Sequence, residues 1–343
     1  MVFSTALEQS GAIDAWGDYL PGISLNNSET NAETNAETNS KTELAPATNT
    51  EKATTCWLNQ FSALKVYGPD AERFLQGQLT CNLSEINQNT FRYGACCNAK
   101  GRTVANFNIS FDGESYWLIM PSESAKILEK HLQKYKVFFK TTLENCSQTH
   151  VILGQWSYQN APQISSQQVI ELNPQRRIVI CPNDDSFTPA QFNWSPTLQW
   201  RLADIKDGLY YLDAEQTEEW IPQHINQHHI NGISFNKGCY TGQEIIARLQ
   251  YLGKAKKALY YYRTDLNQTN HKDLQLDALY NEEGKNQGPI LFSRQQVDSD
   301  TCATLHVLAV LNTSAPEQVL YLDETQEISL SLQNLPYTEE MTA

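Results

Sequence analysis

The sequence predicts an α+β fold whose last ninety residues or so form mainly β-strands. Two observations lead to this prediction. Up to about residue 250, short alternating stretches typical of strands are mixed with amphipathic stretches typical of helices. After Gly253 only strand-like stretches follow, separated by polar turns, a pattern that favours a small barrel or a sandwich.

The expected elements follow from these patterns in chain order. In the first block, strands are expected at residues 63–67, 103–111, 115–120 and 137–143, and helices at residues 69–79 and 122–135. In the second block, strands are expected at residues 149–154 and 177–181, with a helix or turn at residues 200–208. The β region is expected to comprise strands at residues 257–263, 288–292, 304–311, 318–322 and 328–332.

The first domain boundary follows from composition. Residues 26–50 repeat Asn-Ala-Glu-Thr and contain almost no large apolar side chain, so they cannot offset the entropy of ordering. We therefore predict a disordered tail at residues 1–50 and α+β domains at residues 51–145 and 146–250. A C-terminal β domain is expected at residues 251–343.

Composition limits the class of protein. With 343 residues, 40% of them hydrophobic, the chain can bury several cores, yet no apolar stretch is long enough to span a membrane. The first residues lack the basic start of a signal peptide, and eight cysteines show neither a C-x-x-C pair nor zinc-ligand spacing. Reduced thiols and a cytoplasmic location are therefore expected. The net charge of −14 argues against a broad nucleic-acid surface.

The most informative segment is Lys-Gly-Cys-Tyr-Thr-Gly-Gln-Glu at residues 237–244. Thr241 and Glu244 have the spacing of a capping box and predict a helix that continues to Gly253. Cys239 is then expected in a glycine-flexible turn before a helix N-terminus, where the helix dipole and the Lys237 ammonium favour thiolate over thiol. This arrangement predicts a reactive sulfur or an anion site. The alternative is that Cys239 is a small core hydrophobe.

Residues 221–260, which include this octet, resemble the signature of the YgfZ family of bacterial folate-binding proteins. These are relatives of the aminomethyltransferase (T-protein) of glycine cleavage. The family pattern KGCYxGQE is met at all seven fixed positions of residues 237–244. Further similarity is carried by residues 74–83 (FLQGQLTCNL), 98–102 (NAKGR), 134–143 (KYKVFFKTTL) and 335–337 (LPY), so the resemblance covers residues 57–340.

The resemblance implies a fold of two α+β domains and a C-terminal β-barrel around a central hole that binds tetrahydrofolate. Trp200 stands where the family has one ligand-lining tryptophan, and Phe61 stands where it has the other. Phenylalanine keeps a stacking face but loses the indole donor. Residues expected to contact folate are thus Phe61, Trp200, Tyr240, Gln243 and Arg248. For Trp200, packing in the core is the alternative.

Basic side chains are unusually concentrated around the signature, namely Lys237, Arg248, Lys254, Lys256 and Lys257. In an acidic chain this cluster indicates a local positive pocket for a small polyanion, and folate with its glutamyl tail is one. The alternative is a solvated basic helix end. His224 and His228 have the spacing of helical metal ligands, but a solvated loop is the preferred interpretation and no metal is expected.

Two departures from the relatives bear on activity. Ala105 and Asn106 stand where the transferases place a catalytic aspartate, and neither side chain is a general base. Lys206 and Tyr210 replace an acidic residue and a proline that the family prefers.

The resemblance therefore implies a folate-binding accessory factor with Cys239 and Lys237 at its functional centre. Such a factor supports iron–sulfur cluster assembly or repair and iron–sulfur enzymes such as a radical tRNA methylthiotransferase. A folate-dependent aminomethyltransferase is the less favoured alternative, and an adaptor in which Cys239 merely packs is a third.

Overall fold

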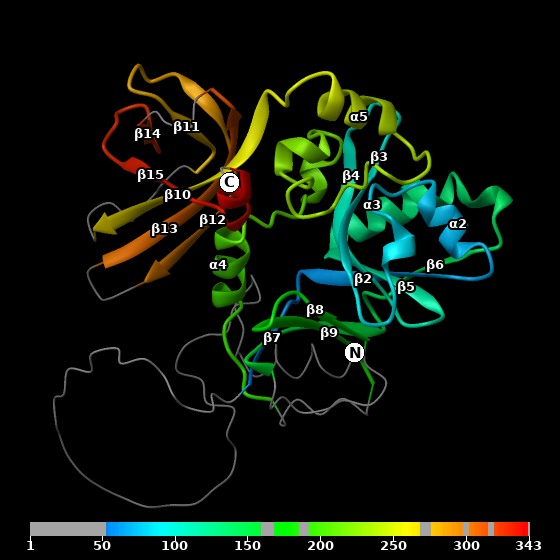
Figure 1. Cartoon of the computed structure of the whole chain (residues 1–343). Coiled ribbons are helices and arrows are strands. Elements are labelled where there is room, and N and C mark those ends of the chain that lie inside the picture. The colour runs from blue at the N-terminus through cyan, green and yellow to red at the C-terminus, as the bar shows by residue number, and fades with distance from the viewer. Residues whose placement is uncertain are drawn as a thin grey trace, which may run out of the picture.

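A computed structural model describes residues 53–158, 168–184, 192–267, 276–297, 302–314 and 319–341. Three β structures make up this part of the chain (Figure 1). The predicted tail at residues 1–50 lies outside the described residues. None of the described helices is long and apolar enough to cross a bilayer.

The first domain is a five-stranded antiparallel sheet in the order β3-β4-β5-β2-β6. Its strands are β2 (Phe61–Tyr67), β3 (Arg92–Cys97), β4 (Thr103–Phe111), β5 (Ser115–Pro121) and β6 (Thr142–Asn145). Its helices are α2 (Ala71–Gln76), α3 (Ser122–Gln133) and the short 3-10 helices η1 (Leu83–Glu85) and η2 (Lys136–Phe138). Side chains alternate across the sheet as the strand pattern predicts. Leu118 and Met120 pack under the helices, whereas Trp117 and Ile119 face the second sheet.

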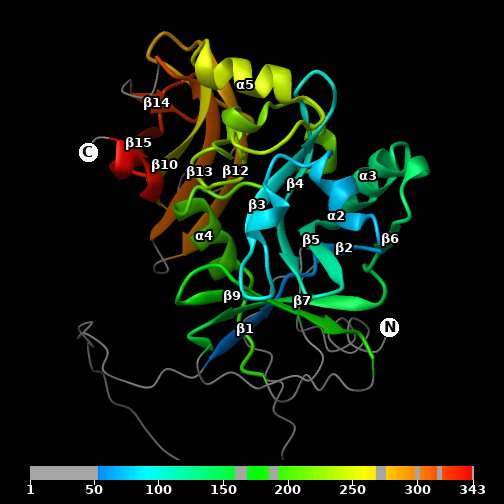
Figure 2. The ribbon, with the colours of Figure 1, turned by 45° about the vertical axis from the view of Figure 1, so that its right-hand side comes forward.

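The second sheet has the order β1-β7-β9-β8 and lies beneath the first (Figure 2). Its strands are β1 (Thr54–Trp57), β7 (His150–Trp156), β8 (Gln168–Glu171) and β9 (Arg176–Pro182). The two sheets share one apolar core, to which Ala63 and Ile119 contribute from the first sheet and Ile152 and Ile180 from the second. Strand β1 precedes the strands of the first sheet in the sequence but pairs with β7, so it belongs to the second sheet.

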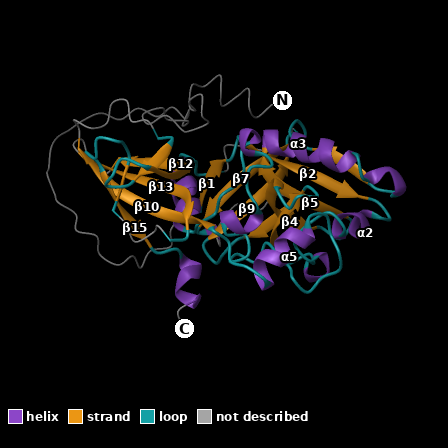
Figure 3. Ribbon diagram, turned by 90° about the horizontal axis from the view of Figure 1, so that it is seen from above, coloured by secondary structure: helices purple, strands orange, loops and turns teal. Residues whose placement is uncertain are grey.

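Helix α4 (Leu198–Lys206) follows the second sheet in the chain and packs against β12 and β13 of a closed six-stranded barrel, which lies to one side of both sheets (Figures 1 and 3). The barrel strands are β10 (Lys257–Asn267), β11 (Ala278–Tyr280), β12 (Asn286–Val297), β13 (Cys302–Asn312), β14 (Leu320–Tyr321) and β15 (Ser329–Gln333). The segments between α4 and the barrel are η5 (Ala214–Gln216), η6 (Pro222–Ile225) and α5 (Gln243–Tyr251), and η8 (Pro336–Met341) follows β15.

The predicted α+β class and the C-terminal barrel are confirmed. Strands β1, β3, β8 and β11 were not expected from the sequence, and one expected strand, at residues 137–143, is wrong over most of its length. Lys136–Phe138 form a 3-10 turn, and the strand begins only at Thr142. The sequence there is rich in β-formers, but Val137 and Phe138 point into solvent and have no neighbouring strand.

The interpretation of the histidines as a solvated loop is also wrong. His224 lies in η6 and His228 follows it, and both side chains are half-buried. The His228 and His229 rings lie 3.8 Å apart between their centroids. Burial lowers the pKa of His224 and of His228 to about 4, so both are neutral at physiological pH.

Candidate functional site

The signature octet ends at the start of α5, but the helix begins differently from the prediction. Gly242 is the N-cap residue, with φ of 84°, and the first helical residue is Gln243. The predicted capping box of Thr241 and Glu244 is therefore wrong: no side chain caps the helix, and the Thr241 hydroxyl donates to Oε1 of Gln78 at 3.4 Å. Gly242, one residue after the expected cap, adopts a left-handed conformation and starts the helix instead of Thr241.

Gly242 brings two distant motifs into contact. A Cβ atom at Gly242 would lie 2.6 Å from the carbonyl oxygen of Asn98, and one at Gly101 would lie 2.8 Å from Cβ of Ile245. Both glycines have positive φ. The turn at residues 98–102 and the start of α5 thus fit together only because neither glycine carries a side chain.

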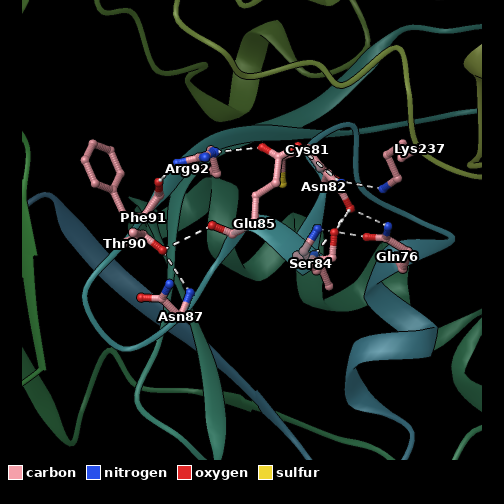
Figure 4. A network of polar contacts seen from close by, with 11 residues as sticks. Gln76, Cys81, Asn82, Ser84, Glu85, Asn87, Thr90, Phe91, Arg92 and Lys237 are labelled. Atoms are coloured by element: carbon pink, nitrogen blue, oxygen red, sulfur yellow. Dashed lines mark hydrogen bonds and ion pairs between the residues drawn. The ribbon is translucent and has the colours of Figure 1, made fainter.

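Lys237 ties the octet to a third motif, residues 74–83. Its ammonium donates to the carbonyl oxygens of Leu79 at 2.8 Å and Cys81 at 2.7 Å, and it lies 5.2 Å from the centroid of the Tyr240 ring. Figure 4 shows Lys237 beside the polar contacts of this turn. There the Asn82 side chain accepts from Nε2 of Gln76 at 2.8 Å and from the Ser84 amide. Lys237 is therefore held against the first domain by a rigid turn.

Burial lowers the pKa of Lys237 to about 8, from an ordinary value of 10.5, while the neighbouring Cys81 partly opposes this shift. Between these two values the unfolded chain binds more protons than the folded chain. We expect the free energy of unfolding contributed by Lys237 to rise as pH increases from about 8 to about 10.5. Urea unfolding of wild type and Lys237→Met across this range measures it. A difference between the two proteins that does not change with pH would contradict the assignment.

Cys239 differs in its exposure from six other cysteines of the described part of the chain. Cys56, Cys81, Cys96, Cys97, Cys146 and Cys181 are all buried, whereas Cys239 is exposed. Burial raises the pKa of Cys81 and Cys146 to about 11 and that of Cys96 and Cys181 to about 12. A Cβ atom at the preceding Gly238 would meet nothing within 4 Å. The core-hydrophobe alternative for Cys239 is thus wrong, because its side chain faces open solvent.

A cavity of about 730 Å³ lies between the first domain, the segment that follows α4, and the barrel. Its wall includes the charged side chains of Arg201, Asp204, Asp213 and Arg294. The rings of Tyr210, Tyr211 and Phe292 supply apolar surface. Its size is typical of a small-molecule site. The cavity therefore combines stacking faces with groups of both charges.

The side chain of Asp204 has an unusual environment in this wall. It is 2% exposed, and Oδ1 accepts from Nη1 of Arg176 at 2.9 Å. Its other oxygen, Oδ2, is buried and has no hydrogen-bond partner within the described part of the chain. Burial raises the pKa of Asp204, while Arg176 and Arg201 act in the opposite direction. Asp204 thus contributes a buried charge behind the cavity wall, whereas Asp213 presents an exposed carboxylate to the cavity.

The two aromatic residues expected to line a folate site both belong to the core between the two sheets, and they differ in whether they reach a recess. Phe61 borders a small recess that shares Asn59, Gln60, Arg201 and Arg294 with the cavity. Trp200 is 2% exposed and does not line the cavity, because its ring packs against Gly154, Trp156 and Arg176. Replacing Trp200 by alanine would open a hole in the core and cost about 3–5 kcal/mol, so this variant cannot test ligand binding cleanly.

The signature residues lie elsewhere. Tyr240 is buried in a small cluster with Cys97 and Ile246, and Gln243 opens α5. Arg248 is exposed on α5, as are Lys254 and Lys256 beyond it. None of these residues lines the cavity of about 730 Å³. Arg248, Lys254 and Lys256 therefore lie at the exposed end of a helix, as the alternative interpretation holds, whereas Lys237 is held against the first domain.

The positions of the missing transferase aspartate have structural roles. Ala105 is buried in the first domain. The Asn106 side chain donates to the Tyr210 carbonyl at 2.5 Å and accepts from the Leu212 amide at 2.8 Å. Both polar atoms of Asn106 are thus used to hold the cavity segment at residues 210–212.

Several cavity residues were missed from the sequence, among them Arg201, Asp204, Tyr211 and Arg294. One signal was available. Arg201 and Asp204 are three residues apart in α4, so they share a helix face. That face turns toward the cavity, whereas Trp200 turns into the core.

No protein-family profile matches the chain. The fold is that of the glycine-cleavage aminomethyltransferases. The structure of glycine cleavage system aminomethyltransferase T from Bartonella henselae aligns with a TM-score of 0.59 and 12% sequence identity, over 83% of this chain and 86% of that one. Within this fold class, curated relatives are closer in sequence. The tRNA-modifying protein YgfZ of Colwellia psychrerythraea is 30% identical over 302 residues, which span 82% of this chain and 92% of the relative.

A second relative, the tRNA-modifying protein YgfZ of Pectobacterium carotovorum, is 30% identical over 305 residues, or 82% of this chain and 90% of the relative. The chain belongs to the YgfZ family. This confirms the resemblance drawn from residues 237–244 and the other motifs.

Proposed function

We propose that the protein is a cytoplasmic folate-binding accessory factor that supports iron–sulfur cluster assembly or repair and iron–sulfur-dependent tRNA modification. The names of its relatives support the link to tRNA modification. The expected partners are iron–sulfur enzymes such as a radical tRNA methylthiotransferase.

The observation that carries the folate proposal is the chemistry of the cavity of about 730 Å³. Arg201 and Arg294 would bind the carboxylates of the glutamyl tail, because guanidinium groups pair with carboxylates in a bidentate manner. The rings of Tyr211 and Phe292 offer stacking surfaces. The exposed carboxylate of Asp213 would accept an N–H group of the pterin ring. Tetrahydrofolate carries carboxylates, a ring that can stack and N–H donors in one molecule.

Cys239 would then act outside this cavity. It does not line the cavity, and its exposed side chain sits beside the open position of Gly238. A thiol presented in this way is accessible to a macromolecular partner. We therefore assign the contact with a partner enzyme to Cys239, with Lys237 anchoring its loop.

The alternative function is folate-dependent transfer of an aminomethyl group, which the fold likeness to the aminomethyltransferase favours. The side chains of Ala105 and Asn106 weigh against it. Alanine carries no proton-transfer group, and the amide of Asn106 is occupied by the backbone at residues 210–212. Turnover of a methylated amine with tetrahydrofolate would establish the alternative.

Titration with tetrahydrofolate, followed by calorimetry, tests the folate proposal. We expect wild type to bind, and Arg201→Gln to weaken binding by about tenfold or more, because a charge-assisted hydrogen bond is removed. Arg248→Gln on α5 is the matched control and should bind like wild type. Equal binding by wild type and Arg201→Gln, with weaker binding by Arg248→Gln, would place the ligand at the signature motif instead.

A further inference from the structure

The segment between α3 and β6 exposes apolar side chains that no part of the described fold covers. Phe138 is 88% exposed and Val137 is 74% exposed. The segment lies at the end of the first domain farthest from the barrel (Figures 1 and 3). An aromatic ring that stays in water contributes little to folding, so its exposure calls for another explanation.

Lysines surround these two residues. Residues 126–140 contain five lysines and a single acidic residue, Glu129, in a chain whose net charge is −14. Lys126, Lys130 and Lys134 follow one another at intervals of four along α3 and its C-cap, and all three are exposed. Such spacing brings like charges together and destabilises a helix. Two further lysines, Lys136 and Lys140, continue the series into the loop.

These lysines are largely without ionic partners. Lys126 pairs with Glu123 at 2.5 Å, while Lys130, Lys134, Lys136 and Lys140 form no ion pair with any described residue. Interaction with the negative end of α3 accounts for Lys130 and Lys134. It does not account for Lys140, which lies beyond the helix, or for the exposed ring of Phe138.

The loop is fixed on both sides of its tip. The Tyr135 ring packs against His131 at 5.2 Å between centroids. The Phe139 ring packs against Phe74 at 5.2 Å, and the Lys140 amide donates to Oδ2 of Asp70 at 2.8 Å. The tip is thus held in place before any partner arrives, which lowers the entropic cost of binding.

We propose that this surface, formed by Lys126, Lys130, Lys134, Lys136, Phe138 and Lys140 and called here the Lys–Phe surface, binds single-stranded RNA. Lys126, Lys130 and Lys134 span about 12 Å along α3, so their ammonium groups would contact successive phosphates of one RNA strand. Phe138 at its end offers a face for one unstacked base.

The arrangement fits RNA better than a membrane or an acidic protein. A membrane-binding loop needs apolar residues that penetrate the bilayer, whereas here only Val137 and Phe138 protrude and the lysines run back along α3. An acidic protein surface would pair with the lysines but leave Phe138 without a flat partner. The surface is local, so it agrees with the absence of a broad basic face.

Fluorescence anisotropy with a labelled single-stranded RNA of about twelve nucleotides tests the proposal, using the full chain at low salt. We expect Phe138→Ser to weaken binding by about tenfold. Replacing Lys130 and Lys134 by glutamine should reduce the slope of log K against log salt by about 0.7 for each phosphate that is no longer neutralised. Matched controls are Leu252→Ser, an exposed apolar residue on another face, and Lys285→Gln on the barrel, which should bind like wild type.

Three results would overturn the proposal. The first is no RNA binding at low salt, and the second is equal affinity of wild type, Phe138→Ser and the lysine variants. The third is binding to phosphatidylserine vesicles, or to polyglutamate, through the same residues without binding to RNA. Tetrahydrofolate titration of the same variants keeps the outcomes separate, because the Lys–Phe surface does not line the cavity and its variants should bind folate normally.

Discussion

Cys239→Ser is expected to abolish support of iron–sulfur-dependent tRNA modification in cells and to leave the fold unchanged. The Cys239 side chain is exposed, so replacing sulfur by oxygen alters no packing and should change stability by less than about 0.5 kcal/mol. A hydroxyl is far less nucleophilic than a thiol at neutral pH and is a poor ligand for soft metals. Complementation of a strain that lacks the protein, read by mass spectrometry of modified tRNA nucleosides, measures the effect.

Alkylation of the purified protein supplies the control. At about pH 8, iodoacetamide should modify Cys239 rapidly, whereas the six buried cysteines stay unmodified until the protein unfolds, because burial both shields their thiols and disfavours the thiolate. Peptide mass spectrometry identifies the modified residues. Full complementation by Cys239→Ser would show that the thiol is dispensable and leave the loop with an adaptor role alone.

Gly242→Ala is expected to destabilise the protein by about 2 kcal/mol or more. A non-glycine residue at φ of 84° costs about 1–2 kcal/mol, and the new methyl group would lie 2.6 Å from the Asn98 carbonyl oxygen. Relieving this contact would separate the start of α5 from the turn at residues 98–102. Thermal unfolding should show a fall in Tm of about 4 °C or more.

Gly238→Ala is the matched control in the same motif. A Cβ atom there would meet nothing within 4 Å, and Gly238 is not among the glycines with positive φ. Its Tm should stay within about 1–2 °C of wild type. If Gly238→Ala were as destabilising as Gly242→Ala, general loss of chain flexibility in the octet, rather than the contact with Asn98, would explain both.

The strongly periodic elements could be predicted from the sequence. The alternation of residues 103–111 predicted β4, which spans Thr103–Phe111, and the amphipathic pattern of residues 122–135 predicted α3 at Ser122–Gln133. Such patterns arise from burial of one face and depend little on distant parts of the chain. Strand β1 was missed because its partners, in β7 and at Trp194, are more than ninety residues away in the sequence.

The candidate site was harder to predict, because it depends on packing between distant segments. The exposure of the Cys239 thiol depends on which distant segments pack against its loop, which local sequence does not record. In α4, adjacent residues diverge: Trp200 turns into the core and Arg201 toward the cavity. The helical period predicts that neighbours face different ways, but only the position of the barrel decides which of them meets a ligand.

The central claim, that tetrahydrofolate occupies the cavity between the domains and the barrel, is tested most directly by a crystal structure of the protein soaked with tetrahydrofolate. We expect ligand density in the cavity, with the glutamyl carboxylates beside Arg201 or Arg294 and a pterin N–H group within hydrogen-bonding distance of the Asp213 carboxylate. Density at the signature loop instead, or none at a saturating concentration of tetrahydrofolate, would contradict it.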